Sequence, residues 1–178
     1  SGTSAVGVAR GIEELSGGGL VVVPVAGPWS PQSVAALIGI ACETLSECAL
    51  IANLRTGRLW GSRPPAGLFF EYLFGRPLAA PPADWDCGHF LSIVASMSGP
   101  GGALVALRDT YRELGWGGHH LQPVEAVAAA LARGDGKEGG VLCVCAPSEA
   151  DVLSERLRAE GFELRLWDNG TPFKDEEE

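Results

Sequence analysis

The chain lacks any apolar run that approaches the roughly 20 residues a helix needs to cross a bilayer, so a membrane-spanning protein is not expected. Basic residues are also scarce. Thirteen Lys and Arg stand against twenty-two Asp and Glu in 178 residues, which gives a formal net charge of −9. Because binding to a phosphate backbone needs clustered Lys and Arg, we expect neither a nucleic acid partner nor a membrane partner.

Cysteines are few and irregularly spaced. Five are present, and an odd number without regular spacing argues against a secreted disulfide framework. Cys143 and Cys145 lie in an apolar run that is typical of a strand, where both thiols would share one face. We therefore expect buried, reduced thiols and a cytoplasmic location.

Signals for cofactors are missing as well. The glycine pairs do not show phosphate-binding spacing after a strand. His119 and His120 are adjacent on a predicted loop with no acidic residue close in sequence, and structural metal sites need about four well-placed ligands. We expect no cofactor and no metal.

What is present indicates one globular α+β domain over residues 1–178. Hydrophobic residues make up 46% and charged residues 20% of the sequence. Ser4 is a candidate N-cap for a helix over 4–15, and Ser30-Pro31 marks the start of a second helix. Strands are predicted at 20–25 and 48–54, followed by a short helix at 68–74 and a proline-rich connector at 75–86. We expect a central antiparallel sheet with flanking helices.

The C-terminal part is expected to form an extension over residues 121–170. A helix begins at Pro123, a strand follows at 141–146, a helix begins near Ser148, and a last strand covers 162–167. This order predicts a β-α-β-like unit. Residues 171–178, which end in an acidic run, are expected to be a disordered tail.

Two apolar runs each carry one polar residue of a catalytic type. His89 lies in the run 88–94 and Asp109 ends the run 105–109, and a glycine-rich turn separates them. If residues 97 and 103 pair across that turn, His89 lies diagonally from Asp109 on the same face, with α-carbons roughly 7–8 Å apart. A shift of the pairing by one residue would place them on opposite faces. The spacing therefore predicts a His–Asp pair in which the carboxylate orients the imidazole.

The order of these motifs resembles that of the papain-like peptidases of bacteriocin-processing transporters and their soluble relatives. The resemblance covers roughly residues 2–111 and rests on an N-terminal helix, an apolar strand, the Gly88-His89-Phe90 motif and a strand that ends at Asp109. The similarity implies a papain-like fold that acts on a peptide or amide bond of a peptide or protein substrate. It implies His89 as the catalytic base and Asp109 as the residue that orients it.

The family's nucleophile and oxyanion residue have no counterpart here. In that family a Gln and then a Cys-Gly pair precede the helix that corresponds to residues 4–15, and this sequence begins after that point. The resemblance thus implies that the catalytic cysteine comes from an upstream segment or a companion polypeptide.

Three alternatives remain open. Cys87 would share a face with His89 in a strand but lacks the helix N-terminus that lowers a thiol pKa, while Cys42 and Cys48 are expected to be packing residues. Ser1 could be a processed N-terminus whose own amine acts as the base. Finally, the domain could be a non-catalytic module that binds a peptide or protein in the former cleft.

Overall fold

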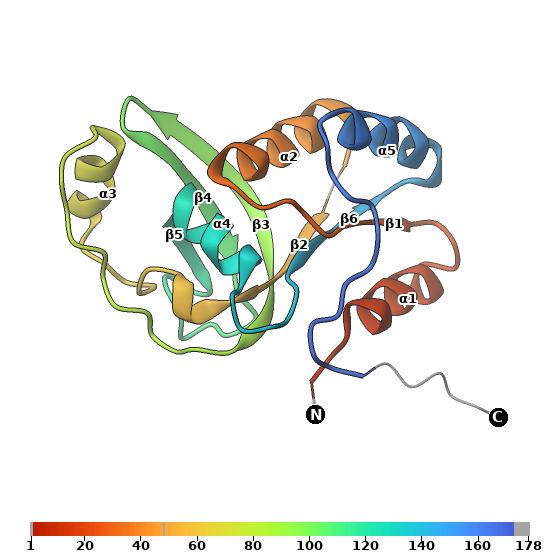
Figure 1. Cartoon of the computed structure of the whole chain (residues 1–178), viewed down its shortest axis with the longest axis horizontal. Helices are drawn as coiled ribbons and strands as arrows, with labels where there is room; N and C mark the ends of the chain where they lie inside the picture. The colour runs from red at the N-terminus through yellow and green to blue at the C-terminus, as the bar shows by residue number, and fades with distance from the viewer. Residues whose placement is uncertain (1, 48, 173–178) are drawn as a thin grey trace.

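The structure is a computed structural model that describes residues 2–47 and 49–172. Its centre is a six-stranded sheet in which every neighbouring pair is antiparallel. In spatial order the strands are β1 (Val21–Val25), β6 (Gly140–Cys145), β2 (Ala49–Arg55), β3 (Gly88–Gly99), β4 (Gly102–Arg108) and β5 (His119–Pro123) (Figure 1). The predicted α+β class with a central antiparallel sheet is confirmed.

Helices cover both faces of this sheet. The main core lies between one face and the helices α2 (Pro31–Thr44), α4 (Val124–Ala132) and α5 (Ala150–Ala159). A smaller cluster on the other face joins α1 (Ala5–Leu15) to Leu142 and Trp167. The helix α3 (Ala66–Leu73) packs near β4 at the far end of the molecule from α1 and α5 (Figure 1). Side chains along β6 alternate between the two clusters. Cys143 and Cys145 face the main core together, as predicted, whereas Leu142 faces the smaller cluster.

Local capping explains where two predicted helices begin. The Ser4 hydroxyl accepts a hydrogen bond from the Gly7 amide at 3.0 Å. Ser30 and Ser33 form a reciprocal capping box at the start of α2, with Pro31 in the first helical turn. Because both caps depend on residues next to each other in the sequence, they could be identified before the fold was known.

The predicted C-terminal β-α-β unit is wrong in its last strand, because residues 162–167 form no strand. Its first strand is present as β6, which lies between β1 and β2, and its helix is present as α5. The 162–167 segment makes only two backbone hydrogen bonds with residues 26 and 27, through the amide and carbonyl of Glu163. Its side chains cross the sheet edge: Phe162 joins the main core, whereas Trp167 packs on the opposite face. Backbone pairing at the single residue Glu163 does not make a strand ladder, so the segment is not a strand.

Two further predictions need correction. Residues 119–123, predicted to be a loop and the start of a helix, form the edge strand β5. Cys42, predicted to be a packing residue, is exposed, and Cys48 lies outside the described residues. Most of the predicted acidic tail, residues 173–178, also lies outside them.

Candidate functional site

The β3–β4 hairpin sets the face on which His89 and Asp109 lie. Near the turn, Gly99 pairs with Gly102 and Met97 with Leu104, one residue away from the predicted register. A β-bulge at Val94 inserts an extra residue into β3, so that Ser92 pairs with Arg108 in the predicted register. Without this extra residue the two functional side chains would lie on opposite faces. The predicted hairpin is therefore confirmed at the site but wrong at its turn.

The predicted contact between His89 and Asp109 is present. The His89 Nε2 atom lies 3.0 Å from Asp109 Oδ1, and the side chains are 14% and 1% exposed, respectively. The same carboxylate oxygen accepts a hydrogen bond from the Tyr111 amide at 2.9 Å. Because a carboxylate only accepts, Nε2 is the nitrogen that donates, and in the neutral form of an imidazole the other nitrogen, Nδ1, is then the acceptor. This arrangement fixes the tautomer that a base needs.

Two aromatic side chains hold the imidazole in place. Trp85 meets the His89 ring edge-on, with ring centroids 4.8 Å apart, and Tyr111 stacks against it at 5.5 Å. Trp85 and Tyr111 also contact each other at 5.4 Å. The ring orientation of His89 is therefore set by packing as well as by the carboxylate.

His89 opens into a cavity of about 470 Å³. Gly2 and Thr3, the segment just before α1, line this cavity together with Gly88 and His89. Its other lining residues are Asn53, Phe90, Thr110, Tyr111, Arg133, Lys137, Asn169 and Thr171. Residues from the N-terminal segment, β2, β3, the loop after β4, the loop after α4 and the C-terminal segment thus meet at one site.

Tyr111 also lines a second, mostly apolar cavity. It measures about 350 Å³ and is lined by Trp85, Tyr111 and Leu114 with two acidic residues. Since Tyr111 lines both cavities and stacks against His89, the imidazole lies close to a polar and to an apolar recess. Such a pair of recesses is suited to an extended ligand with one polar and one apolar end.

Among the described residues, the alternative nucleophile Cys87 is not brought to this cavity. Cys87 is partly buried, its backbone is bound to Thr56, and it is absent from the residues that line the His89 cavity. His119 and His120 project on opposite faces of β5, because one is exposed and the other buried. Ser1 lies outside the described residues.

Sequence reasoning missed Asn53 and Arg133. Asn53 is 1% exposed; its amide nitrogen donates to the His89 carbonyl at 3.3 Å, and its oxygen accepts from the Trp167 indole. Arg133 is 3% exposed and follows α4, far from His89 in the sequence. A polar Asn inside an apolar strand was a visible signal, whereas nothing near Arg133 in the sequence pointed to His89.

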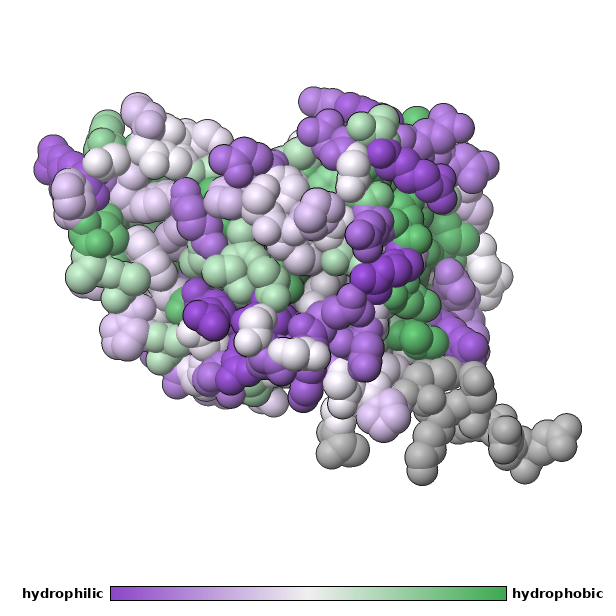
Figure 2. Space-filling view, in the orientation of Figure 1, coloured by the Kyte–Doolittle hydropathy of each residue, from purple (hydrophilic) through white to green (hydrophobic). Residues whose placement is uncertain are grey.

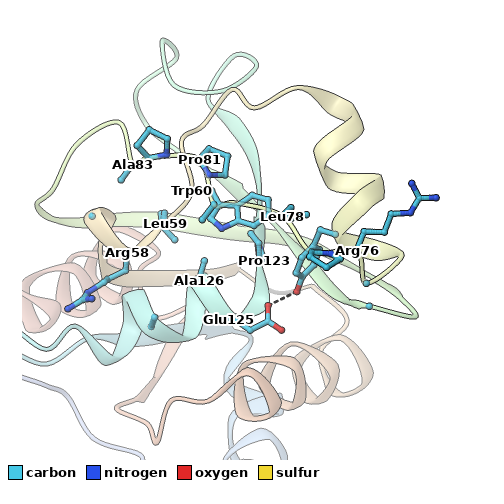
Figure 3. Close-up of a pocket in the computed structure, with 18 residues that line it drawn as sticks. Arg58, Leu59, Trp60, Arg76, Leu78, Pro81, Ala83, Pro123, Glu125 and Ala126 are labelled. Carbon is cyan, nitrogen blue, oxygen red and sulfur yellow. Dashed lines mark hydrogen bonds between the residues drawn. The ribbon is translucent and has the colours of Figure 1, made fainter.

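A larger cavity of about 860 Å³ lies elsewhere, between α3, α4 and the proline-rich connector (Figure 3). Trp60 and Leu59 lie at its centre, while the Arg58 and Arg76 side chains extend outward at its two ends. The Tyr72 hydroxyl donates to Glu125 at its margin; burial, followed by this hydrogen bond, raises the pKa of Tyr72. Neither His89 nor Asp109 lines this cavity.

The fold and site together define an α+β domain whose antiparallel sheet holds a buried Asp109 carboxylate against the partly exposed His89 imidazole at a polar cavity. The protein belongs to a family of unknown function (DUF6885), whose profile matches residues 1–168. No curated protein and no solved structure matches it. Over the described residues, none of the helices is long and apolar enough to cross a membrane.

Proposed function

We propose that this protein supplies the base and the orienting residue of a papain-like cysteine-peptidase-type domain that hydrolyses a peptide or amide bond. The observation that supports this most directly is the His89–Asp109 contact at 3.0 Å beside an open cavity. A buried carboxylate that fixes the tautomer of a partly exposed imidazole is the arrangement that general base catalysis requires.

In the proposed reaction, His89 Nδ1 takes the proton of a cysteine thiol. The thiolate then attacks the substrate carbonyl carbon, and the imidazolium returns the proton to the leaving amine as the C–N bond breaks. Water, deprotonated by the same imidazole, hydrolyses the thioester and releases the acid and the free thiol. Asp109 stabilises the imidazolium in both steps without taking its proton.

The position of α1 supports an origin of the thiol just before this helix. Gly2 and Thr3 line the same cavity as His89, and Ser4 caps the helix. A thiol at a helix N-terminus has a lowered pKa and is a better nucleophile at neutral pH. The papain-like resemblance likewise implies a nucleophile at the N-terminal end of this helix, on a segment upstream of Gly2 or on a companion polypeptide.

A cysteine placed at Thr3 tests this proposal in the protein itself. In a Cys87→Ser background, we expect the thiol of Thr3→Cys to react with iodoacetamide at neutral pH at least tenfold faster than the exposed native Cys42. Adding His89→Ala should remove this advantage. Peptide mapping by mass spectrometry separates the sites.

Two results would count against the proposal. The first is a Thr3→Cys thiol that reacts no faster than Cys42. The second is a fast reaction that persists in the His89→Ala variant, because the helix N-terminus alone would then explain it.

A second candidate function is a non-catalytic module that binds a peptide or protein. The cavity of about 860 Å³ favours it, since Trp60 and several prolines of the connector offer rigid apolar contact area there (Figure 3). Peptide binding that survives His89→Ala and is lost in Trp60→Ala would support this function over hydrolysis.

A further inference from the structure

The cavity beside His89 has an unusual charge balance for this protein. The net charge of the whole sequence is −9, yet the described residues that line the cavity include Arg133 and Lys137 and no acidic residue. The amide groups in the lining are already engaged: Asn53 bonds His89 and Trp167, and Asn169 bonds residues 3 and 171. The charged side chains that line the cavity are therefore cationic, and they stand beside the hydroxyl groups of three threonines and Tyr111.

Arg133 is held in place by its backbone and by one carboxylate. Its φ of 61° lies in the left-handed region that a residue with a side chain rarely adopts. Its Nε and Nη2 atoms donate to Asp135 at 3.1 and 2.9 Å. Asp135 also accepts from Arg55 at 2.9 Å, so one carboxylate serves two guanidinium groups. Figure 2 shows hydrophilic residues gathered over this loop.

One nitrogen at the other end of this guanidinium finds no partner among the described residues. Arg133 Nη1 is buried and makes no hydrogen bond with any of them, and the side chain is 2% exposed. Buried donors without a partner are rare in folded proteins and call for an explanation. Nη1 also lies against the backbone beside His89: a Cβ at Gly88 would stand 3.1 Å from both Nη1 and Nη2. Gly88 therefore permits the guanidinium to reach this cavity.

We infer that the cavity binds a carboxylate of the ligand through Arg133 Nη1, with the Lys137 ammonium adding attraction. Arg is suited to this task because its planar N–H groups match a carboxylate. The inference deepens the proposed function and rests on it for one step: the bound carboxylate would lie next to the bond that His89 acts on. The substrate class is then a peptide or amide with a carboxylate, either a peptide's own C-terminus or an acidic side chain, close to the cleaved bond.

Binding of short peptides to the protein tests this without requiring turnover. The probes are acetyl-trialanine as the free acid, the same peptide as its C-terminal amide, and acetyl-Ala-Glu-Ala amide, each titrated by NMR. We expect the free acid or the Glu peptide to bind at least tenfold more tightly than the trialanine amide. Which of the two binds tells a C-terminal from a side-chain carboxylate.

Variants then assign the preference to Arg133. Arg133→Gln and Arg133→Lys should abolish it, and Lys137→Gln should weaken it several-fold. Gly88→Ala keeps the Arg133 charge but crowds Nη1, so it should also reduce the preference even if Arg133→Gln fails to fold. The control Arg165→Gln removes an exposed arginine that pairs with Glu138 outside the cavity and should change nothing.

The outcomes separate this inference from the proposed function. Equal binding of acid and amide, or a preference that persists in folded Arg133→Gln and Gly88→Ala, overturns the inference even if Thr3→Cys shows His89-dependent reactivity. A carboxylate preference that depends on Arg133, with no activation of the Thr3→Cys thiol, retains the binding site and rejects the hydrolase.

Discussion

Replacing Asp109 with alanine is the most direct test of the His–Asp pair. The substitution removes a carboxylate that is 1% exposed and accepts from both His89 Nε2 and the Tyr111 amide. A buried polar group left without a partner costs about 1–3 kcal/mol. The His89 side chain is 14% exposed and can recover part of its loss from water. The lower part of that range, about 1–2 kcal/mol, applies to each of the two groups left without a partner. We therefore expect the free energy of unfolding to fall by about 2–4 kcal/mol.

The assay is urea denaturation at pH 7.5, supported by thermal melting. For a domain of this size, 1 kcal/mol shifts Tm by roughly 2–4 °C, so the expected decrease is about 5–15 °C. Glu155→Ala, an exposed position on α5, serves as the matched control and should change stability by less than about 0.5 kcal/mol. Asp109→Asn keeps one acceptor oxygen and should cost less than Asp109→Ala. If Asp109→Ala is no more destabilising than the control, the contact between His89 and a buried Asp109 carboxylate is incorrect.

Two further predictions concern pH and packing. Burial lowers the pKa of His120 from its ordinary value near 6.5, so the folded state binds fewer protons than the unfolded state as the pH falls. The free energy of unfolding is therefore fully present above about pH 6.5 and decreases below it. Urea melts should give the wild-type protein a lower free energy of unfolding at pH 5.5 than at pH 7.5. His120→Gln should make this difference smaller, whereas the exposed His119→Gln should leave it unchanged. The same difference in the wild type and both variants would contradict the prediction. Gly140→Ala should destabilise the protein by about 1–3 kcal/mol, because its Cβ would overlap the buried Trp167 ring. Gly39→Ala, in α2 with open space at Cβ, is its control and should not destabilise in the same urea melts.

Local signals in the sequence determined much of the secondary structure. Ser4 and the Ser30-Pro31 pair mark helix starts because their side chains and ring act on the next few residues only. The alternation that places Cys143 and Cys145 on one face follows from strand geometry alone. The His89–Asp109 pair could also be predicted, since a hairpin joins residues that are close in the sequence.

The predicted pairing of His89 with Asp109 is nevertheless correct only because two deviations in the hairpin cancel. The turn is one residue away from the predicted register, and the bulge at Val94 restores the register before His89 is reached. Both features depend on how β3 pairs with its neighbours on either side, which no local pattern in the hairpin indicates.

Only the tertiary structure decided which distant segments complete the sheet and the site. Strand β6 enters between β1 and β2, and the 162–167 segment crosses the sheet edge, because each buries side chains against partners far away in the sequence. Arg133 reaches the cavity through a left-handed turn and the space above Gly88, neither of which has a sequence signature of its own. Local hydrogen bonding and side-chain alternation act over a few residues and can be read directly from the sequence. Burial and charge pairing act between whatever the fold brings together, so they are settled only in three dimensions.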